Sequence, residues 1–542
     1  MRRIASLSLR KDVVYHWQIT EQAATQMDKI QFNLYMRSKF AWIFFCMTLG
    51  VYLLTSPAHF LTTPDEQINL RTTLSLLEGQ RGAIPAFPAG FASKTGIDGK
   101  EYAQYGLGLP VAAAPWMAVG RMIYPGQEVD FTAWMQAPPG TMEDQIPEIV
   151  DPDGFFFLKV WASLFTIVVS ALTVVVFVDL LLLIGVRLLW VQICGALYAF
   201  GTYQWQHGRT FFTEPLTTLC LLAAFWALVQ ARKNGLWKWY LLAGFCWAYG
   251  IFTRPDTLVT GLAAAWLLLV DPDKKDSPID FDWKRIIAFA APWFVFGVLV
   301  LLYNQYRFDS LFSTGYEDQS EGVHFTTPVL VGLHGFFFTP GRSLFFYSPP
   351  LLLALFGLAS FWKRDRWLAG GVFLLVGGYL IVMSMWQNWA GGFDWGPRHI
   401  FQITPFVMLI GAAGLNDGAW FDAKWKYAGL VALLLLGAGI QLLGISADPV
   451  ETIRAFLMRY PEMQVAPGMP LTSMLLQFNV YLPQFSSPVL HWNAVWDGQA
   501  FSLWPLVFRN GLYLTVCARL AIILFVALLI AMFAHLRTKP NA

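Results

Sequence analysis

Charged residues are scarce in this sequence. Of its 542 residues, 13% are charged and 56% are hydrophobic. A soluble globular chain carries about 25% charged residues, so this chain has too little polar surface to cover itself in water. Its formal net charge of +2 does not indicate a nucleic-acid partner.

Cysteines are also few, and all of them lie inside apolar runs. The sequence therefore predicts neither a disulfide framework nor a zinc site. No internal repeat, low-complexity tract or glycine-rich strand–helix turn for a nucleotide sugar stands out. A cleavable signal peptide is not expected, because the first apolar run starts near Phe40, after a polar leader. The cysteines are Cys46, Cys194, Cys220, Cys246 and Cys517.

Long apolar runs, in contrast, recur along the whole chain, as helices that cross a hydrocarbon core of about 30 Å require. They predict an all-α integral membrane protein with about twelve transmembrane helices. The fifth and sixth runs are short and also fit a hairpin bent at 253–256. The expected crossings are 40–57, 155–184, 188–204, 212–230, 237–252, 257–271, 286–303, 344–361, 367–385, 400–415, 427–445 and 511–535.

The distribution of Lys and Arg predicts the orientation, because short cytoplasmic segments are enriched in these residues. The leader 1–39 is basic, and with this threading the other basic segments fall on its side of the membrane. The apolar stretch 107–123 would invert everything after it if it were a crossing. We expect an interfacial segment there; a re-entrant loop is the alternative.

The expected location is the cytoplasmic membrane, and this threading divides the chain into three parts. They are a cytoplasmic leader (1–39), a transmembrane catalytic module (40–415) and a C-terminal membrane region (416–542). Large outer loops are expected at 58–154, 304–343 and 446–510.

The first outer loop opens with Thr63-Pro64-Asp65-Glu66. Thr63 as N-cap, Pro64 at the first helical position and Glu66 three residues after the cap are typical of a capping box. The acids can therefore serve only to favour a helix start. A capping box uses Glu66 and leaves Asp65 free at the membrane surface, so Asp65 is the candidate catalytic acid.

Other outer turns place acids and arginines beside helix starts. Arg209 and Glu214 flank one turn, and Arg254 lies in the next. Ionisable groups at membrane depth are costly and usually functional. Together with the start of the first outer loop, which carries Asp65, these two turns predict a polar pocket at the outer end of the bundle.

The turn before the expected crossing 400–415 ends in Arg398-His399, and Arg342 lies in the central loop. A planar guanidinium suits a phosphate. The aromatic residues around Arg398 also fit a simple belt at the membrane interface.

These motifs resemble the GT-C superfamily of membrane glycosyltransferases, in the branch of the protein O-mannosyltransferases and the lipid A aminoarabinose transferase. The resemblance covers roughly residues 40–415 and depends on the order, spacing and common sidedness of the motifs. They are TPDE (63–66), YAQYGLGLP (102–110), FFTEPLTT (211–218) and WAGGFDWGPRHIFQITP (389–405).

The resemblance implies a bacterial transferase that moves a sugar from a polyprenyl-phosphate-linked donor to an acceptor hydroxyl of a cell-envelope glycan, lipid or protein. It implies an active site between the first outer loop and the bundle. Asp65 matches the family's catalytic acid, and Glu214 falls where a second acid occurs. The resemblance assigns no function to residues 446–510.

The chemistry of these residues is consistent with an inverting displacement. Asp65 would take the proton of the acceptor hydroxyl, with Glu66 and Glu214 beside it. The leaving phosphate needs its charge stabilised. The candidates for binding it are Arg398, Arg342, Arg254, Arg209 and His399.

The sequence establishes no cofactor and leaves a divalent metal open. If a divalent metal is bound, Asp65 and Glu214 are its expected ligands. Two other functions fit a chain of this kind, namely a flippase or transporter of lipid-linked glycans and a glycan polymerase or ligase. A transporter would favour inverted repeats and helices broken at the midplane, and polymerases place their functional loop late in the chain, whereas here the acids lie early.

Overall fold

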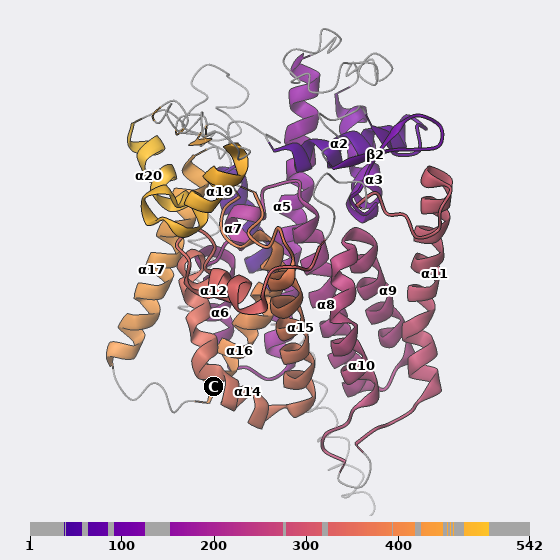
Figure 1. Ribbon diagram of the computed structural model, residues 1–542. Helices are drawn as coiled ribbons and strands as arrows, with labels where there is room; N and C mark the ends of the chain where they lie inside the picture. The colour runs from indigo at the N-terminus through magenta and orange to yellow at the C-terminus, as the bar shows by residue number, and fades with distance from the viewer. Residues whose placement is uncertain are drawn as a thin grey trace, which may run out of the picture.

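The computed structural model (Figure 1) describes most of the chain between residues 39 and 497. The described part is almost entirely helical and contains one small sheet, so the predicted all-α fold is confirmed. The described ranges are 39–56, 63–84, 92–124, 152–274, 278–316, 324–392, 394–417, 424–447 and 471–497, with Arg37, Thr452, Ile453, Phe456 and Arg459.

Long helices run side by side and form a bundle. In chain order they are Lys39–Leu54, α5 (Pro152–Leu183), α6 (Leu188–Gly201), α8 (Thr213–Asn234), α9 (Trp237–Thr253), α10 (Gly261–Leu269), α11 (Trp283–Phe308), α14 (Leu353–Arg364), α15 (Arg366–Met385), α16 (Thr404–Asn416) and α17 (Lys424–Ser446).

Shorter elements join these helices or cover one end of the bundle. The joining elements are α7 (Gln204–His207), η3 (Pro255–Thr260), α12 (Val329–Phe338), α13 (Leu344–Tyr347), η4 (Pro349–Leu352) and η5 (Arg398–Ile403). The covering elements are α2 (Pro64–Leu77), β1 (Ala83–Ile84), β2 (Ser93–Thr95), β3 (Glu101–Ala103), α3 (Gly108–Ile123), α19 (Leu471–Tyr481), η7 (Pro483–Phe485) and α20 (Ser487–Trp496).

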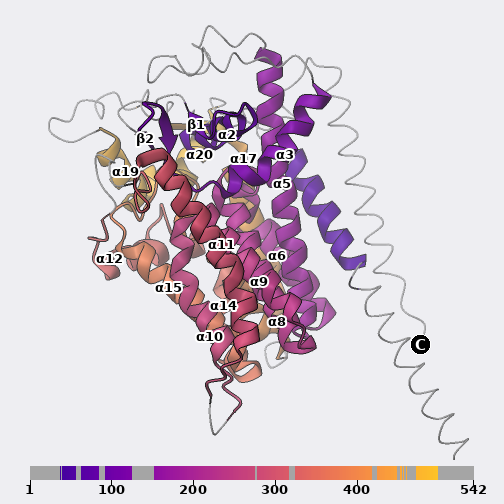
Figure 2. The ribbon, with the colours of Figure 1, turned by 90° about the vertical axis from the view of Figure 1, so that its right-hand side faces the viewer.

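The two ends of the bundle differ (Figures 1 and 2). The upper end carries α2, the sheet, α3, α19 and α20, and the connection between α10 and α11 lies at the lower end. The strands pair antiparallel in the order β1-β3-β2, and Tyr102 of β3 lies opposite Ala83 and Lys94. Chain segments that are far apart in sequence therefore meet at the upper end.

Six of the described helices are long and apolar enough to cross a membrane: α5, α8, α11, α15, η5 with α16, and α17. The expected crossing 344–361 is divided into α13, η4 and α14, because Pro349 and Pro350 cannot donate the backbone bonds of a regular helix. The central loop holds a short apolar helix, α12, that the sequence analysis missed. The crossing 511–535 lies outside the described residues, and the total of twelve stays a prediction.

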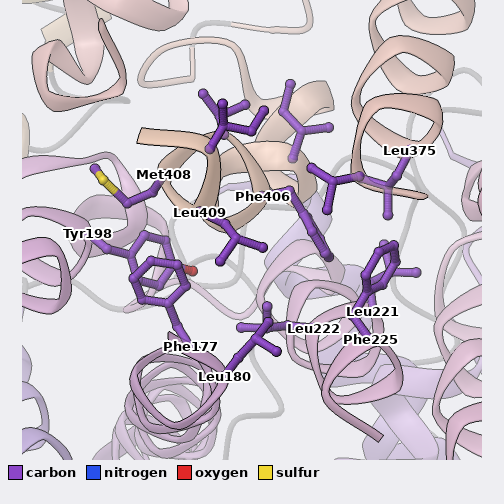
Figure 3. Packing of buried hydrophobic residues seen from close by; sticks show 14 of the residues in the cluster. Phe177, Leu180, Tyr198, Leu221, Leu222, Phe225, Leu375, Phe406, Met408 and Leu409 are labelled. Atoms are coloured by element: carbon purple, nitrogen blue, oxygen red, sulfur yellow. The ribbon is translucent and has the colours of Figure 1, made fainter. Parts of the chain in front are cut away.

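The centre of the bundle is α16. Its span is 94% buried, whereas that of α11, at the edge, is 6% buried. Figure 3 shows Phe406 and Leu409 of α16 packed among side chains of α5, α6 and α8. A Cβ atom on Gly357 of α14 would lie 1.9 Å from the carbonyl oxygen of Ile410, so α14 and α16 approach closely because Gly357 lacks one.

The stretch 107–123 forms α3. Leu109, Ala113, Met117 and Gly120 make its buried face, which packs on α2 and α5, whereas the exposed residues Val111, Val119, Met122 and Ile123 are apolar. An apolar outer face on a helix beside the upper end favours the predicted interfacial segment.

Candidate active site

Asp65 is positioned by the start of α2. The predicted capping box is confirmed, because Glu66 Oε2 accepts hydrogen bonds from the backbone N–H and the hydroxyl of Thr63, at 3.2 and 2.9 Å. The carboxylate of Asp65 takes no part in it. Instead Asp65 Oδ1 accepts a bond of 2.5 Å from the Tyr105 hydroxyl, and Oδ2 accepts one of 2.6 Å from Arg398.

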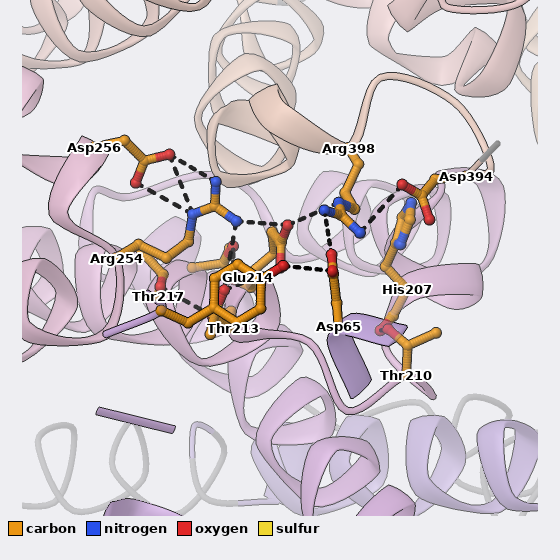
Figure 4. Close-up of polar contacts among 12 residues, drawn as sticks. Asp65, His207, Thr210, Thr213, Glu214, Thr217, Arg254, Asp256, Asp394 and Arg398 are labelled. Atoms are coloured by element: carbon orange, nitrogen blue, oxygen red, sulfur yellow. Dashed lines mark hydrogen bonds and ion pairs between the residues drawn. The ribbon is translucent and has the colours of Figure 1, made fainter. Parts of the chain in front are cut away.

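Arg398, at the start of η5, is bound by three carboxylates (Figure 4). Its Nη2 lies 2.6 Å from Asp65, its Nε 3.2 Å from Glu214 and its Nη1 3.1 Å from Asp394. The guanidinium also lies over the ring of Phe212, 4.6 Å from the centroid. It thereby joins the first loop, the start of α8 and the turn before η5.

Glu214 connects this arginine to a second one. Its Oε1 lies 2.6 Å from Arg254 Nη1, and Arg254 Nη2 lies 2.7 Å from Asp256. Burial alone would lower the pKa of Arg254, but Asp256 and Glu214 outweigh that effect and raise it, so the guanidinium stays charged. Asp65, Glu214, Arg254, Asp256, Asp394 and Arg398 together are called the acid–arginine cluster.

The acid–arginine cluster has more acids than arginines, and helix ends compensate for the difference. Asp65, Glu214 and Asp256 each lie in the first turn of a helix, α2, α8 and η3 respectively. A helix N-terminus carries about half a positive charge and free N–H groups, so it stabilises an anion. Such ends also bind phosphates. The place where the N-termini of the long helices α2 and α8 lie is therefore suited to anionic groups.

The structure brings together Asp65, Glu214, Arg254 and Arg398, which the sequence analysis placed on separate outer turns. Asp394 and Tyr105 were missed. Asp394 reads as an ordinary turn residue between glycines, and Tyr105 lies in a motif that gave no chemical role. Their only signal was their place within the motifs 389–405 and 102–110.

Glu66 holds α2 against the segment that enters α8. Its Oε1 accepts a bond of 3.0 Å from the backbone N–H of Phe211, and the side chain of Asn69 donates to the Phe211 carbonyl at 3.2 Å. Glu66 therefore ties the start of α2, which carries Asp65, to the segment that leads into Glu214.

Two predicted phosphate-binding arginines lie outside the cluster. Arg209 donates to Trp205 O at 3.3 Å, to Gln206 Oε1 at 2.5 Å and to the carbonyl of Thr55. Arg342 is fully buried and donates to Ala390 O at 2.5 Å, among other acceptors. Both guanidiniums donate to backbone carbonyls and so hold the backbone around them, and their predicted part in phosphate binding stays a prediction.

Two buried histidines lie near the cluster. His399, beside Arg398, is 4% exposed, its ring centroid lies 4.5 Å from that of Trp386, and neither ring nitrogen has a hydrogen-bond partner among the described residues. His207 Nε2 is 2.8 Å from the carbonyl oxygen of Trp395. Burial lowers the pKa of His207, although Asp394 opposes the shift.

The residues that were expected to bind a metal do not form a ready site. Arg398 lies between Asp65 and Glu214, where a cation bound by both carboxylates would have to lie. In the described residues, no group of three or more His, Cys, Asp or Glu side chains stands in a metal-binding arrangement.

Solved structures with related architectures are distant. The chain is similar to ArnT from Cupriavidus metallidurans bound to undecaprenyl phosphate, with 10% identity, a TM-score of 0.43, and 93% of this chain and 77% of that chain covered. It is similar to an Archaeoglobus fulgidus oligosaccharyltransferase tethered with an acceptor peptide, with 10% identity, a TM-score of 0.44, and coverage of 85% and 63%.

AglB from Archaeoglobus fulgidus, in complex with an inhibitory peptide and a dolichol phosphate, is similar with 11% identity and a TM-score of 0.42, with coverage of 84% and 61%. The chain thus spans less than two thirds of the two archaeal chains. TM-scores below 0.5 carry no functional argument. The sequence matches no curated protein.

A family model gives the firmer comparison. Residues 156–299 match the family described as dolichyl-phosphate-mannose-protein mannosyltransferase. This segment runs from α5 into α11 and contains Glu214, Arg254 and Asp256, whereas Asp65 and Arg398 lie outside it. Over these residues the chain is therefore similar to a family of membrane mannosyltransferases, which confirms the resemblance to GT-C glycosyltransferases predicted from the sequence.

Proposed function

We propose that this protein transfers a sugar from a polyprenyl-phosphate-linked donor to an acceptor hydroxyl, with inversion at the anomeric carbon. The observation that carries the proposal is the direct contact of 2.6 Å between Asp65 of the first loop and Arg398 of the late turn, beside the N-terminal turns of α2 and α8. A base and an anion-binding group are thereby adjacent. The match of residues 156–299 to a mannosyltransferase family supports the same reaction class.

The donor phosphate and Asp65 compete for Arg398. Asp65 Oδ2 accepts a hydrogen bond from Arg398 and Oδ1 accepts one from Tyr105, so each carboxylate oxygen already has one donor. A phosphate offers the guanidinium a two-pronged partner. When it binds Arg398, Oδ2 is released towards the acceptor hydroxyl. Donor binding therefore precedes activation of the acceptor.

The transfer itself is a single displacement. The acceptor oxygen forms a bond with the anomeric carbon, and its proton moves to Asp65. The bond between that carbon and the phosphate oxygen breaks, and the polyprenyl phosphate leaves with the electron pair. Arg398 stabilises the developing negative charge, and Glu214 and Arg254 keep Arg398 in place.

The proposed location is the outer face of a cytoplasmic membrane. Arg232 lies in the last turn of α8, whose first turn carries Glu214, and it pairs with Asp271, three residues before Lys274; Lys363 lies in the last turn of α14. Under the positive-inside rule the end of the bundle that holds Arg232 is cytoplasmic, so the acid–arginine cluster faces outward. Lipid-linked donors and envelope acceptors meet on that side.

The experiment that tests the function uses purified protein in nanodiscs. It is supplied with a panel of polyprenyl-phosphate-linked hexoses and pentoses and an acceptor extract, and release of polyprenyl phosphate is followed by mass spectrometry. We expect release by the wild type. The variant Asp65→Asn should bind polyprenyl phosphate and release about 10²-fold less, since general-base catalysis contributes about 10²–10⁴-fold.

Two variants serve as controls. Glu101→Gln removes an acid of the nearby sheet that bonds Thr95 and should leave turnover unchanged. Glu66→Gln should lower the melting temperature and have little effect on kcat, because Glu66 connects α2 to Phe211. Normal turnover by Asp65→Asn would rule out the base. Lipid binding without release by the wild type would favour the flippase or transporter, and release with extension of a lipid-linked glycan would favour the polymerase or ligase.

A further inference from the structure

The turn that carries Asp394 and Arg398 is held from both sides by elements that lie elsewhere in the sequence. It spans 386–397, between α15 and η5, and is called the late turn. Its described residues, 386–392 and 394–397, form no helix or strand, and Gly391 and Gly396 have positive φ angles of 68° and 74°. Because such a segment does not define its own shape, its neighbours must define it.

On one side, Arg342 binds the backbone of the late turn. Its Nε donates to the carbonyl of Ala390 at 2.5 Å, and its Nη2 donates to the carbonyl of Gly392. Its Nη1 donates to Gly341 O at 2.5 Å and to Asn479 Oδ1 at 3.0 Å. All three guanidinium nitrogens are thus engaged, and two of them fix carbonyls directly before Asp394.

Asn479 of α19 in turn orients Arg342. Its Oδ1 accepts from Arg342, and its Nδ2 donates to Phe485 O at 2.9 Å and to Ser487 Oγ at 3.3 Å. The backbone of Gly341 also donates to Val480 O at 3.1 Å. A Cβ atom on Gly341 would lie 2.2 Å from the carbonyl oxygen of Asn479, so the two segments are in direct contact.

On the other side, Trp395 is enclosed by C-terminal elements. Its ring lies 4.8 Å from that of His491 on α20 and 5.1 Å from that of Tyr347. A Cβ atom on Gly444 of α17 would lie 2.5 Å from the indole. Gln441, also on α17, donates to the carbonyl of Tyr347 at 2.6 Å.

We infer that α17, α19 and α20 form a clamp that sets the position of Asp394 and Arg398, with Arg342 and Asn479 as its positioning residues. The inference rests on the proposed function. Neither residue contacts the reactive carboxylate of Asp65. They act through the late turn, because its backbone at 390–392 and its side chain at 395 are fixed on both sides of Asp394. This assigns a function to the C-terminal region, to which the family resemblance assigned none.

The test compares Asn479→Ala with Asn493→Ala in the full-length protein. Asn493 lies on α20, two residues after His491, and among the described residues its side chain makes no hydrogen bond with the late turn. Small displacements of catalytic groups cost up to about 10²-fold in rate. We expect Asn479→Ala to lower kcat at least about tenfold, with polyprenyl phosphate binding within about twofold of the wild type, and Asn493→Ala to leave kcat unchanged.

A second measurement separates positioning from a general loss of structure. If Asn479 acts through Asp394, the variants Asn479→Ala and Asp394→Asn affect the same interaction, and the double variant should lose less than the product of the two single losses. Arg342→Lys keeps the buried charge but not the fork, and should give an intermediate kcat. If Asn479→Ala does not fold, the kcat of Arg342→Lys tests the inference in its place.

The inference is overturned if folded Asn479→Ala has wild-type kcat, if the losses in the double variant multiply, or if Arg342→Lys has wild-type kcat. These outcomes presuppose an active wild type. Absence of any donor turnover by the wild type would instead contradict the proposed function, so the two failures are distinguishable.

Discussion

At the scale of single residues, Arg398 has more partners than it can keep when a phosphate arrives. Its three carboxylate neighbours lie 2.6, 3.1 and 3.2 Å from its nitrogens. Glu214 is also held by Arg254 at 2.6 Å, whereas among the described residues Asp65 has Tyr105 as its one hydrogen-bonding partner besides Arg398. The pair between Arg398 and Asp65 is therefore the one that the donor can replace while the rest of the network persists.

Replacing Arg398 with lysine should weaken donor binding although the charge is kept. Lysine is a point charge and cannot span three carboxylates and a phosphate. We expect a loss of about tenfold for Arg398→Lys, and a larger one for Arg398→Ala, since a hydrogen bond to a charged group contributes about 1.5–3 kcal/mol. The measurement is the Kd for polyprenyl phosphate by titration in nanodiscs, together with kcat.

Equal binding by the wild type and Arg398→Lys would show that Arg398 only anchors the helix end at the headgroups. Arg187, which bonds Asn416 at the lower end of the bundle, supplies the matched control Arg187→Lys. That variant should leave both quantities unchanged.

At the scale of elements, the sequence predicted what is encoded locally. The capping box of α2 is written in four consecutive residues, so its hydrogen bonds and the freedom of Asp65 from it were predictable. The contact between Arg342 and Asn479 joins residues 137 positions apart. The sequence around Arg342 does not indicate Asn479, nor the reverse, because only the packing of α19 beside the late turn brings the two residues together.

The clamp element α20 should be sensitive to acid through His491. Burial lowers the pKa of His491 from 6.5 to about 4. Because the unfolded chain binds a proton at higher pH than the folded one, stability is complete above pH 6.5 and is lost as the pH falls towards 4. The expected loss between pH 7.5 and pH 5 is about 2 kcal/mol for this group.

The check is thermal unfolding of the purified protein at these two pH values. The melting temperature should fall further on acidification for the wild type than for His491→Gln, because the glutamine side chain stays neutral. The exposed His334 provides the control His334→Gln, which should behave like the wild type. An identical acid response in all three proteins would show that His491 contributes nothing.

At the scale of the whole molecule, burial distinguishes centre from edge. The span of α16 is 94% buried and that of α11 is 6% buried, although both are apolar. Hydrophobicity alone could not separate them, because in lipid a helix is apolar whether it faces acyl chains or other helices. The sequence therefore predicted most of the helices and missed their arrangement, and with it the central place of α16.

The orientation is testable by labelling single cysteines in intact cells, in a background without the native cysteines. Lys100 lies exposed beside the sheet at the upper end, and Lys363 lies exposed at the end of α14. We expect Lys100→Cys to react with a membrane-impermeant maleimide and Lys363→Cys to react only after permeabilisation. The reverse pattern would invert the proposed sidedness.

The junction between Arg342 and Asn479 limits how the chain can be recombined. The fully buried guanidinium of Arg342 depends on an acceptor supplied by α19. A chimaera that takes its C-terminal region from a relative, joined at the predicted boundary after residue 415, would leave that guanidinium facing a foreign partner. A joint placed before Thr339 would transfer both halves of the contact together. The functional boundary of the C-terminal region thus lies 77 residues earlier than its sequence boundary, before residue 339 and not after residue 415, since both sides of a buried polar contact must be exchanged as one unit.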